Sequence, residues 1–324
     1  MTSAPCDLCQ GTSFREISAT DRHGQPLATV ACEKCGLVRH AVLPTEGELT
    51  AFYSKDYRKA YNGESTPGAR RIMRAWTNGE RICDQIGSQL KPGGRLLEVG
   101  AGIGCTVKVF EKAGFQAEGI DPGGEFLQFS MKNLNAKVRV QTLDDLQGQN
   151  TFDTILLVHV IEHLRSPLAA LRKIGSLLKP GGMFYVECPN LQAPFARRSQ
   201  LFHFAHIHNF VPSTLQMMAE ASGFELVQRF GDERDPNLQM LFRHTGKCHL
   251  QVDSRNFQRT IDQLRRADFV PYFSRPRYVL DRIRKVAGYA REHLQAKAFV
   301  DGLIEECRKE TSVRSSAGGH AKAA

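Results

Sequence analysis

The sequence has no long hydrophobic run, and it holds a single tryptophan among 324 residues. No apolar stretch approaches the ~18 residues that a membrane-crossing helix needs, so we expect no transmembrane segment. Residues 1–6 lack a basic segment followed by an apolar one, which predicts that no secretion signal is present. Hydrophobic residues make up 41% of the chain, enough for a packed core in a protein that we expect to be cytoplasmic.

Cysteine is present in nine copies, and four of them form two Cys-x-x-Cys pairs. Cys6 and Cys9 are separated from Cys32 and Cys35 by 22 residues. Each pair fits a tight turn that points two thiolates at one centre, and four thiolates suit the tetrahedral preference of zinc. We therefore expect a zinc ribbon over residues 1–44. With four protein ligands the metal has no open position, so its role is expected to be structural.

A glycine-rich turn follows the apolar segment 95–99. Gly100, Gly102 and Gly104 stand at alternate positions, and a helical pattern comes after them. Such a turn lets the backbone approach a ligand closely. The dinucleotide-binding fingerprint would need a further glycine at Cys105, so the spacing does not match it. The next strand ends at Asp121, where a carboxylate can accept hydrogen bonds from a ribose diol.

Strands and helices alternate from residue 95 onward, which predicts a parallel sheet with helices on both faces. Two further strands, 224–230 and 238–242, are expected to close it as an antiparallel pair. The expected fold class is α/β, a seven-stranded doubly wound Rossmann-like sheet with a small N-terminal zinc ribbon and a helical C-terminal extension. The remaining predicted strands cover 95–99, 117–120, 137–140, 153–158 and 183–188.

These motifs resemble those of the class I S-adenosylmethionine (SAM)-dependent methyltransferases. Residues 98–104, Glu-Val-Gly-Ala-Gly-Ile-Gly, are similar to the first family motif, and residues 119–122, Gly-Ile-Asp-Pro, to the second. The segments 152–164 and 178–182 are similar to the later strand and turn. The resemblance covers roughly residues 90–245 and implies the methyltransferase fold, SAM as cofactor and methyl transfer as the activity.

The resemblance also carries cofactor contacts over to particular residues. The main chain of Gly100 to Gly102 would approach the methionine part and the ribose of SAM, and Asp121 would take the ribose hydroxyls. The family often places an acid at the adenine amine, where this chain has Thr142; the Leu143 main chain or Asp144 could substitute. The full predicted cofactor set is Glu98, Gly100, Ala101, Gly102, Gly104, Asp121, Pro122, Thr142, Leu143, Asp144 and His159.

Methyl transfer to a neutral hydroxyl or an acidic C–H needs a base, and histidine suits proton removal near neutral pH. His163 follows the fourth strand beside Glu162, and a histidine-rich run occupies residues 203–210. We expect His208 to be the base, followed by His163 and then His206; the alternative for each is a satisfied structural hydrogen bond. A metal site made of His203, His206 and His208 is not favoured, because the run offers no carboxylate at suitable spacing.

The expected domains follow from these motifs. They are the ribbon 1–44, a helical linker and cover 45–90, the methyltransferase core 91–246, a helical extension 247–314 and a disordered tail 315–324. Aromatic residues of the linker could line a pocket or pack between domains: Phe52, Tyr53, Tyr57 and Tyr61. Apolar positions of the extension repeat at helical spacing and predict a docked helix or an oligomer contact: Val279, Ile283, Val286, Ala290 and Leu294.

The acceptor is expected to be a small molecule that contains a sugar. The ribbon, the Phe-Tyr-Ser stretch that starts at Phe52 and the core together are similar to a subgroup that methylates nucleotide-linked or polysaccharide sugars at carbon or oxygen. A nucleic-acid methyltransferase is the first alternative, since eleven Lys or Arg stand against six Asp or Glu in residues 271–324. A solvated helix face explains that charge equally well, and no Asn-Pro-Pro-Tyr motif is present. A non-enzymatic binding module is the second alternative.

Overall fold

The computed structural model describes residues 4–52, 66–193 and 196–319. Its contacts divide the chain into two compact units, Met1–Phe52 with Gln147–Tyr278 and Tyr53–Leu146 with Val279–Ala324. This division does not follow the predicted boundaries after residues 44, 90 and 246, because segments distant in sequence share sheets and cores. The predicted aromatic positions Tyr53, Tyr57 and Tyr61 lie outside the described residues.

Seven strands form one sheet in the order β10-β11-β8-β7-β4-β5-β6. β4, β5 and β6 pair in parallel, as do β7 and β8, whereas β11 is antiparallel to both β8 and β10. The predicted doubly wound sheet with an antiparallel closing pair is therefore confirmed. Its strands are β4 (Arg95–Val99), β5 (Gln116–Asp121), β6 (Val138–Val140), β7 (Phe152–Val158), β8 (Leu178–Pro189), β10 (Phe224–Phe230) and β11 (Asn237–His244).

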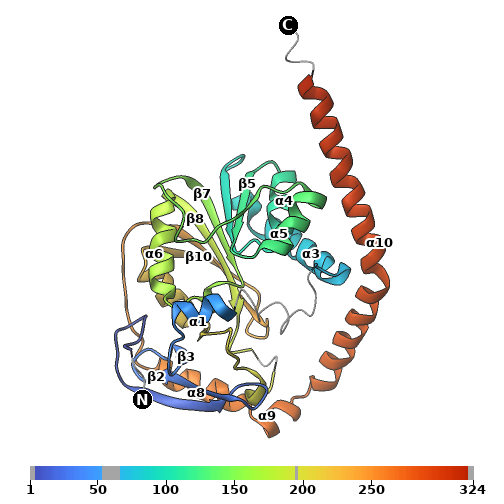
Figure 1. Ribbon diagram of the computed structural model, residues 1–324. Helices are drawn as coiled ribbons and strands as arrows, with labels where there is room; N and C mark the ends of the chain where they lie inside the picture. Colours follow the sequence, from blue (N-terminus) through green and yellow to red (C-terminus); the bar gives the residue numbers. More distant parts are fainter. Residues whose placement is uncertain (1–3, 53–65, 194–195, 320–324) are drawn as a thin grey trace. The chain divides into compact units, whose positions relative to one another are not determined.

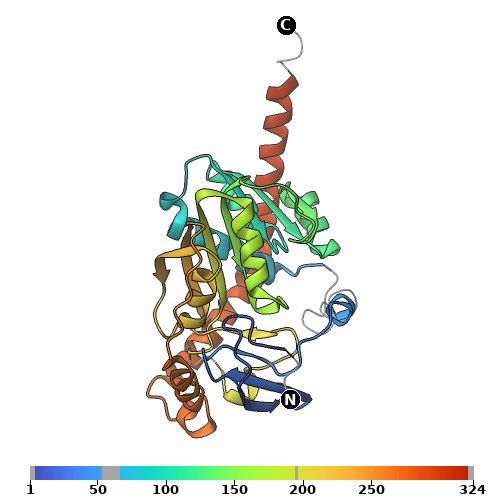
Figure 2. The same cartoon turned by 90° about the vertical axis from the view of Figure 1, so that its left-hand side faces the viewer.

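A second, four-stranded sheet in the first unit carries the cysteine pairs. Its order is β1-β2-β3-β9, with β1 (Phe14–Thr20), β2 (Pro26–Cys32), β3 (Val38–His40) and β9 (His208–Asn209). The yellow segment that carries β9 lies against the blue N-terminal strands (Figure 2). The ribbon is thus completed by a strand from the middle of the chain, β9.

Helix α8 (Asn256–Arg266) covers this small sheet (Figure 1). Its buried Phe257 and Leu264 join Ala31 of β2 and Val38 of β3 in one hydrophobic cluster. Burial of such side chains drives the packing of ribbon against helix. The other helical segments of the unit are α1 (Glu46–Ala51), η4 (Ile161–His163), α6 (Pro167–Leu177), η5 (Arg198–Gln200), α7 (Pro212–Glu220) and α9 (Phe269–Phe273).

Local sequence signals account for two of these helix starts. Thr45 and Glu48 form the predicted capping box of α1, with the Glu48 N–H donating to Thr45 Oγ1 at 3.2 Å and the Thr45 N–H donating to Glu48 Oε2 at 2.7 Å. Pro167 opens α6, where its missing N–H costs nothing. The segment 178–182, Leu-Lys-Pro-Gly-Gly, directly follows α6 and already belongs to a strand, because β8 begins at Leu178.

The second unit packs its helices against β4 and β5. Gly79 of α3 (Ala69–Ile86) allows close approach to α4 (Cys105–Lys112): a Cβ added at Gly79 would lie 2.9 Å from Thr106 Cα. The predicted helix over 69–90 is confirmed in its main part, with the 3₁₀ turn η2 (Gly87–Gln89) at its end. The unit also contains α5 (Gly124–Phe129), the π-helical turn η3 (Ser130–Leu134) and α10 (Tyr278–Gly319).

Helix α10 differs from the prediction in length and in the face that it buries. It continues to Gly319, past residue 315, where the sequence predicts that order ends. Ala296, Val300, Leu303 and Cys307 are buried, whereas the apolar positions predicted to dock are exposed, Leu294 to 81%. Lys112 of α4 pairs with Glu306, and at 3.1 Å with Glu310, which holds the later turns in place. Among the described residues no helix combines the length and apolar character needed to cross a membrane.

Candidate functional site

The glycine-rich loop of the second unit closes on the carboxylate that ends the next strand. The Gly102 N–H donates to Asp121 Oδ2 at 3.0 Å, and the Gly123 N–H donates to Asp121 Oδ1 at 2.7 Å. The N–H groups of Gly100 and Ala101 donate to the Ile120 carbonyl at 2.8 and 2.9 Å. The two motifs predicted to hold SAM therefore form one hydrogen-bonded structure, with Pro122 next to the anchoring carboxylate.

Two glycines of the loop serve different purposes. Gly102 has φ +51°, and a Cβ built there would meet nothing within 4 Å, so this position borders open space. Gly104 has φ +75° and starts α4, but a Cβ there would lie 2.1 Å from Ser130 Oγ. Gly102 thus fits close approach of a ligand to the backbone, whereas Gly104 is required by packing.

Glu98 is a buried carboxyl at the end of β4, only 4% exposed. Burial, with the charge of Asp121 as a further cause, raises its pKa to about 8. Its Oε2 atom is buried and has no hydrogen-bond partner. The structure thus presents Glu98 as a predominantly neutral group at neutral pH.

The segment predicted to meet adenine forms a small turn of its own. The Thr142 hydroxyl donates to Asp145 Oδ2 at 2.6 Å, and the Asp145 N–H returns a bond to Thr142 Oγ1 at 3.3 Å. The Leu143 side chain is buried and Asp144 is exposed. The Thr142 hydroxyl is therefore hydrogen-bonded to Asp145 within the turn, whereas the Asp144 side chain is exposed.

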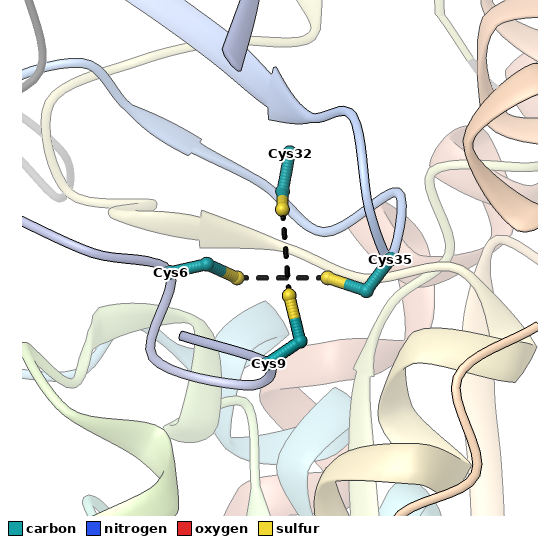
Figure 3. A group of neighbouring side chains, drawn as sticks. All are labelled: Cys6, Cys9, Cys32 and Cys35. Atoms are coloured by element: carbon teal, nitrogen blue, oxygen red, sulfur yellow. Dashed lines mark hydrogen bonds between the residues drawn. The ribbon is translucent and has the colours of Figure 1, made fainter. Parts of the chain in front are cut away.

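The four cysteines of the ribbon converge as predicted (Figure 3). Cys6 Sγ lies 3.5 Å from Cys35 Sγ, and Cys9 Sγ lies 3.5 Å from Cys32 Sγ. A tetrahedron with zinc–sulfur bonds of ~2.3 Å has edges of about 3.8 Å, so these separations fit a four-sulfur metal centre. All four side chains are buried, and sulfurs of this spacing can all ionise only with a cation among them.

The two cysteine turns differ in where they need a left-handed residue. In the second turn Gly36 takes φ +77°, but in the first Gln10 has φ +57°. Gly11 is needed for space, because a Cβ there would lie 3.3 Å from the sulfurs of Cys9 and Cys32. Glycine is thus needed for its left-handed backbone at residue 36 and for lack of space at residue 11.

A cluster of imidazoles surrounds Glu162 in the first unit. Glu162 Oε1 lies 3.7 Å from His163 Nε2, 4.0 Å from His206 Nε2 and 3.5 Å from His159 Nδ1. The Glu162 side chain is 2% exposed, and the side chains of His163 and His206 are 14% and 20% exposed. The tertiary structure thus brings together three histidines that the sequence predicted at separate sites.

His159 joins this cluster to a second buried carboxylate, Glu187 of β8. His159 Nε2 lies 3.7 Å from Glu187 Oε1. Burial works against protonation of His159, but the carboxylates of Glu162 and Glu187 outweigh it and raise its pKa to about 10. Glu187 is not among the site residues predicted from the sequence. A single carboxylate within the apolar run Phe184 to Cys188 is nevertheless a pattern that could have indicated a functional residue.

His208 does not fit the role of base that the sequence predicted for it. It is fully buried in β9, its Nδ1 donates to the Leu164 carbonyl at 3.0 Å, and burial lowers its pKa to about 3. Proton transfer requires access to the substrate, which a buried ring lacks. His208 is a structural residue, and His203 and His40 are buried beside it with pKa values lowered by burial to about 3 and about 4.

The comparison with protein families agrees with this geometry. Residues 70–229 match the family described as "Methyltransferase domain". The sheet order, the glycine loop and its closure on Asp121 fit that match. The chain contains a class I SAM-dependent methyltransferase domain.

Curated relatives of this methyltransferase domain cover only part of the chain. This chain is 34% identical over 106 residues to the ubiquinone biosynthesis O-methyltransferase of Xanthomonas campestris. The aligned segment spans 31% of this chain and 44% of that protein. The enzyme of the same name from Nitrobacter winogradskyi is 33% identical over 101 residues, spanning 30% and 39%. The chain therefore spans less than half the length of these relatives.

Solved structures similar to the methyltransferase domain have low sequence identity. The 1,6-didemethyltoxoflavin-N1-methyltransferase of Burkholderia thailandensis, solved with S-adenosylhomocysteine, is 18% identical and has a TM-score of 0.49. The match covers 72% of this chain and 100% of that protein. A putative S-adenosylmethionine dependent methyltransferase from Listeria monocytogenes is 14% identical and has a TM-score of 0.44, and the match covers 52% of this chain and 99% of that protein.

Proposed function

We propose that the protein transfers the methyl group of SAM to a hydroxyl oxygen of a small acceptor. The observation that carries this proposal is the glycine loop closed on Asp121, within a domain that matches the methyltransferase family. SAM supplies a methyl group already activated by the sulfonium. The protein then has to bind and orient the acceptor, exclude water and accept a proton.

The cofactor contacts proposed from the sequence fit the loop. The Gly100 to Gly102 backbone would border the methionine part, and the Asp121 carboxylate would accept the ribose hydroxyls. Asp144, or the Leu143 main chain, would contact adenine, because Thr142 is already bonded to Asp145. Glu98, Gly104 and Pro122 would shape the loop, and His159 would lie toward the amino-acid end.

The base is proposed to be an imidazole of the cluster around Glu162. His163 Nδ1 donates to the Ala205 carbonyl at 2.8 Å, so its Nε2 carries the lone pair that can accept a proton. His206 is the second candidate, since its ring is also partly exposed. His208 is fully buried and is therefore not suited to be the base.

The acceptor class has two candidates that share a hydroxyl group. The proposed sugar-containing acceptor rests on the ribbon and its neighbouring segment. The matched relatives, named for ubiquinone biosynthesis, instead support an aromatic hydroxyl. Both classes offer a hydroxyl group to the methyl of SAM.

We also propose that the four cysteines hold one structural zinc ion. Their sulfur separations and complete burial support a closed site with no position for substrate. Metal binding would then stabilise the small sheet and the segment that carries β9.

The test is a screen of zinc-loaded protein with methyl-labelled SAM against nucleotide sugars, glycans, catechols and a structured RNA, read by mass spectrometry. We expect an O-methylated sugar or aromatic product that disappears in the Asp121→Ala variant. Methylation of RNA alone would support the nucleic-acid alternative. Absence of SAM binding by calorimetry would support the binding module and overturn the proposed enzyme.

A further inference from the structure

Glu162 and Glu187 are two buried carboxylates of the first unit that differ in how they are satisfied. Glu187 accepts a hydrogen bond from the Tyr185 hydroxyl at 3.0 Å and one from the Asn237 amide at 2.8 Å. Glu162 is 2% exposed, and neither of its oxygens has a hydrogen-bond partner. Burial of a carboxylate that accepts no hydrogen bond is costly, and an imidazole 3.5 Å away offsets that cost only in part, so Glu162 is suited to a closer positive charge.

Among the described residues, the cationic groups paired with Glu162 are three imidazoles, and none of them lies within hydrogen-bond distance. The separations of 3.5 to 4.0 Å from Oε1 exceed the ~2.7–2.9 Å of a charge-assisted hydrogen bond. Ligands around one metal ion at ~2.1 Å are instead about 3.0–3.4 Å apart. A shift of a few tenths of an ångström for His163, and about half an ångström for His206, would bring them to that spacing.

The orientation of His163 suits metal binding. Its Nδ1 donates to the Ala205 carbonyl at 2.8 Å, which fixes the tautomer and turns the Nε2 lone pair toward Glu162. A backbone carbonyl in this outer position is the usual support of a metal-ligating histidine. His206 also turns its Nε2 toward Glu162, and its ring packs on His203 at 3.8 Å between centroids.

We propose that Glu162, His163 and His206 bind a divalent transition-metal ion at a second site, distinct from the four cysteines. The donor atoms of these three residues lie within 4.8 Å of one another. Two imidazoles and one carboxylate suit zinc, iron, cobalt or manganese, and they leave coordination positions open for water or an acceptor oxygen. The sequence analysis set aside a metal site in the histidine run for want of a carboxylate, and Glu162 supplies it from another segment.

If the protein transfers a methyl group as proposed, the acceptor hydroxyl would bind at an open coordination position of this metal ion. An oxygen bound to a divalent ion loses its proton more easily than a free hydroxyl does, so the ion would take the place of the imidazole base, whose Nε2 lone pair it would occupy. His159, held between Glu162 and Glu187, would then position Glu162 rather than bind the ion.

The test is a titration with cobalt(II), without SAM or acceptor, of full-length protein prepared with one zinc ion per chain, so that zinc fills the cysteine site and the second site stays open. We expect one cobalt ion per chain with visible d–d bands and without the thiolate-to-cobalt charge-transfer band that a cysteine site would give. Glu162→Gln and His206→Asn should each raise the Kd for cobalt at least tenfold, and His23→Ala, an exposed histidine of the ribbon, should leave it unchanged. Zinc content and melting temperature report whether each variant is folded. If Glu162→Gln does not fold, His206→Asn alone tests the site.

Two results would overturn the proposed second site. One is zinc-loaded protein that binds no additional cobalt; the other is cobalt binding that is unchanged in a folded variant at residue 162 or 206. Because the titration contains no SAM, these results leave the SAM-binding measurement, and with it the proposed methyl transfer, to be judged separately.

Discussion

Asp7 accepts a hydrogen bond from the Leu168 N–H at 2.9 Å, across 161 residues of sequence. Asp7 lies inside the first cysteine turn, and Leu168 is in the first turn of α6. The same carboxylate accepts a bond from the Ser166 hydroxyl at 2.8 Å, and Ser166 in turn accepts the Ala169 N–H. A ribbon residue therefore completes the N-terminal cap of a helix in the methyltransferase domain, where a negative charge also interacts favourably with the helix dipole.

Substitution of Asp7 by alanine should destabilise the protein by about 2 kcal/mol, because two charge-assisted hydrogen bonds at a helix start are lost. Urea unfolding of zinc-loaded protein measures this change. Asp7→Asn keeps an acceptor oxygen and should lose less. An unchanged unfolding midpoint for Asp7→Ala, with zinc content intact, would show that the contact contributes nothing.

Removal of the ribbon metal should loosen β9 as well as the cysteine turns. Cys6→Ser with Cys35→Ser is expected to lose the tightly held zinc and to increase amide exchange in residues 203–210, since β9 pairs with β3. Elemental analysis and hydrogen–deuterium exchange report the two effects. Cys248→Ser, at an exposed cysteine, is the matched control and should change neither. Loss of zinc with normal protection of β9 would contradict this coupling.

Loss of the Asp121 carboxylate should weaken SAM binding, whereas loss of the Glu118 carboxylate on the same strand should not. We expect Asp121→Ala to raise the Kd for SAM at least tenfold, equivalent to about 1.4 kcal/mol, because loop anchor and ribose acceptor are lost together. Glu118→Gln, on the same strand, removes ion pairs with Arg95 and Arg139 and should leave the Kd unchanged. Calorimetry measures the Kd for SAM of both variants. Equal Kd values for the two variants would show that Asp121 is not part of the SAM site.

Two glycine substitutions should separate binding from folding. Gly102→Ala places a methyl group toward open space and should weaken SAM binding, with a cost of about 1 kcal/mol for its left-handed backbone. Gly104→Ala drives a methyl group into Ser130 and should lower the melting temperature by more. Thermal melts and SAM calorimetry on both variants test this difference. A larger loss of melting temperature for Gly102→Ala than for Gly104→Ala would contradict it.

Stability should fall as pH rises from about 4.5 to 8, because of Glu98. Its pKa is raised to about 8 in the folded protein from an ordinary 4.5, chiefly by burial, so the folded state keeps a proton that the unfolded chain releases. The slope is at most about 1.4 kcal/mol per pH unit for one proton. Urea unfolding at pH 5.5 and 7.5 should show a smaller decrease for Glu98→Gln than for wild type. Identical slopes would mean that Glu98 does not titrate in this range.

Most of the large sheet could be predicted from sequence, since its signals are local. Alternation of apolar strands with helices, the glycine turn after Val99 and the spacing of the cysteines each depend on neighbouring residues. Pro167 and the Thr45–Glu48 box likewise mark helix starts through bonds within one turn. Helix α10 shows the limit of such signals: its periodic apolar residues are exposed, whereas Ala296, Val300, Leu303 and Cys307 are buried. Ion pairs also join this helix to α3 and α4.

The sequence by itself determined the cysteine ligands, the glycine loop and Asp121, because the chemistry of each is contained within a short segment or a fixed spacing. Only the tertiary structure decided which histidine is reachable and which carboxylate it meets. Pairing of residues 38–39 with 208–209 buries His208, and the loop before it carries His206 to Glu162. Exposure, pKa and ligand geometry depend on segments more than 40 residues apart, and no local pattern encodes that meeting.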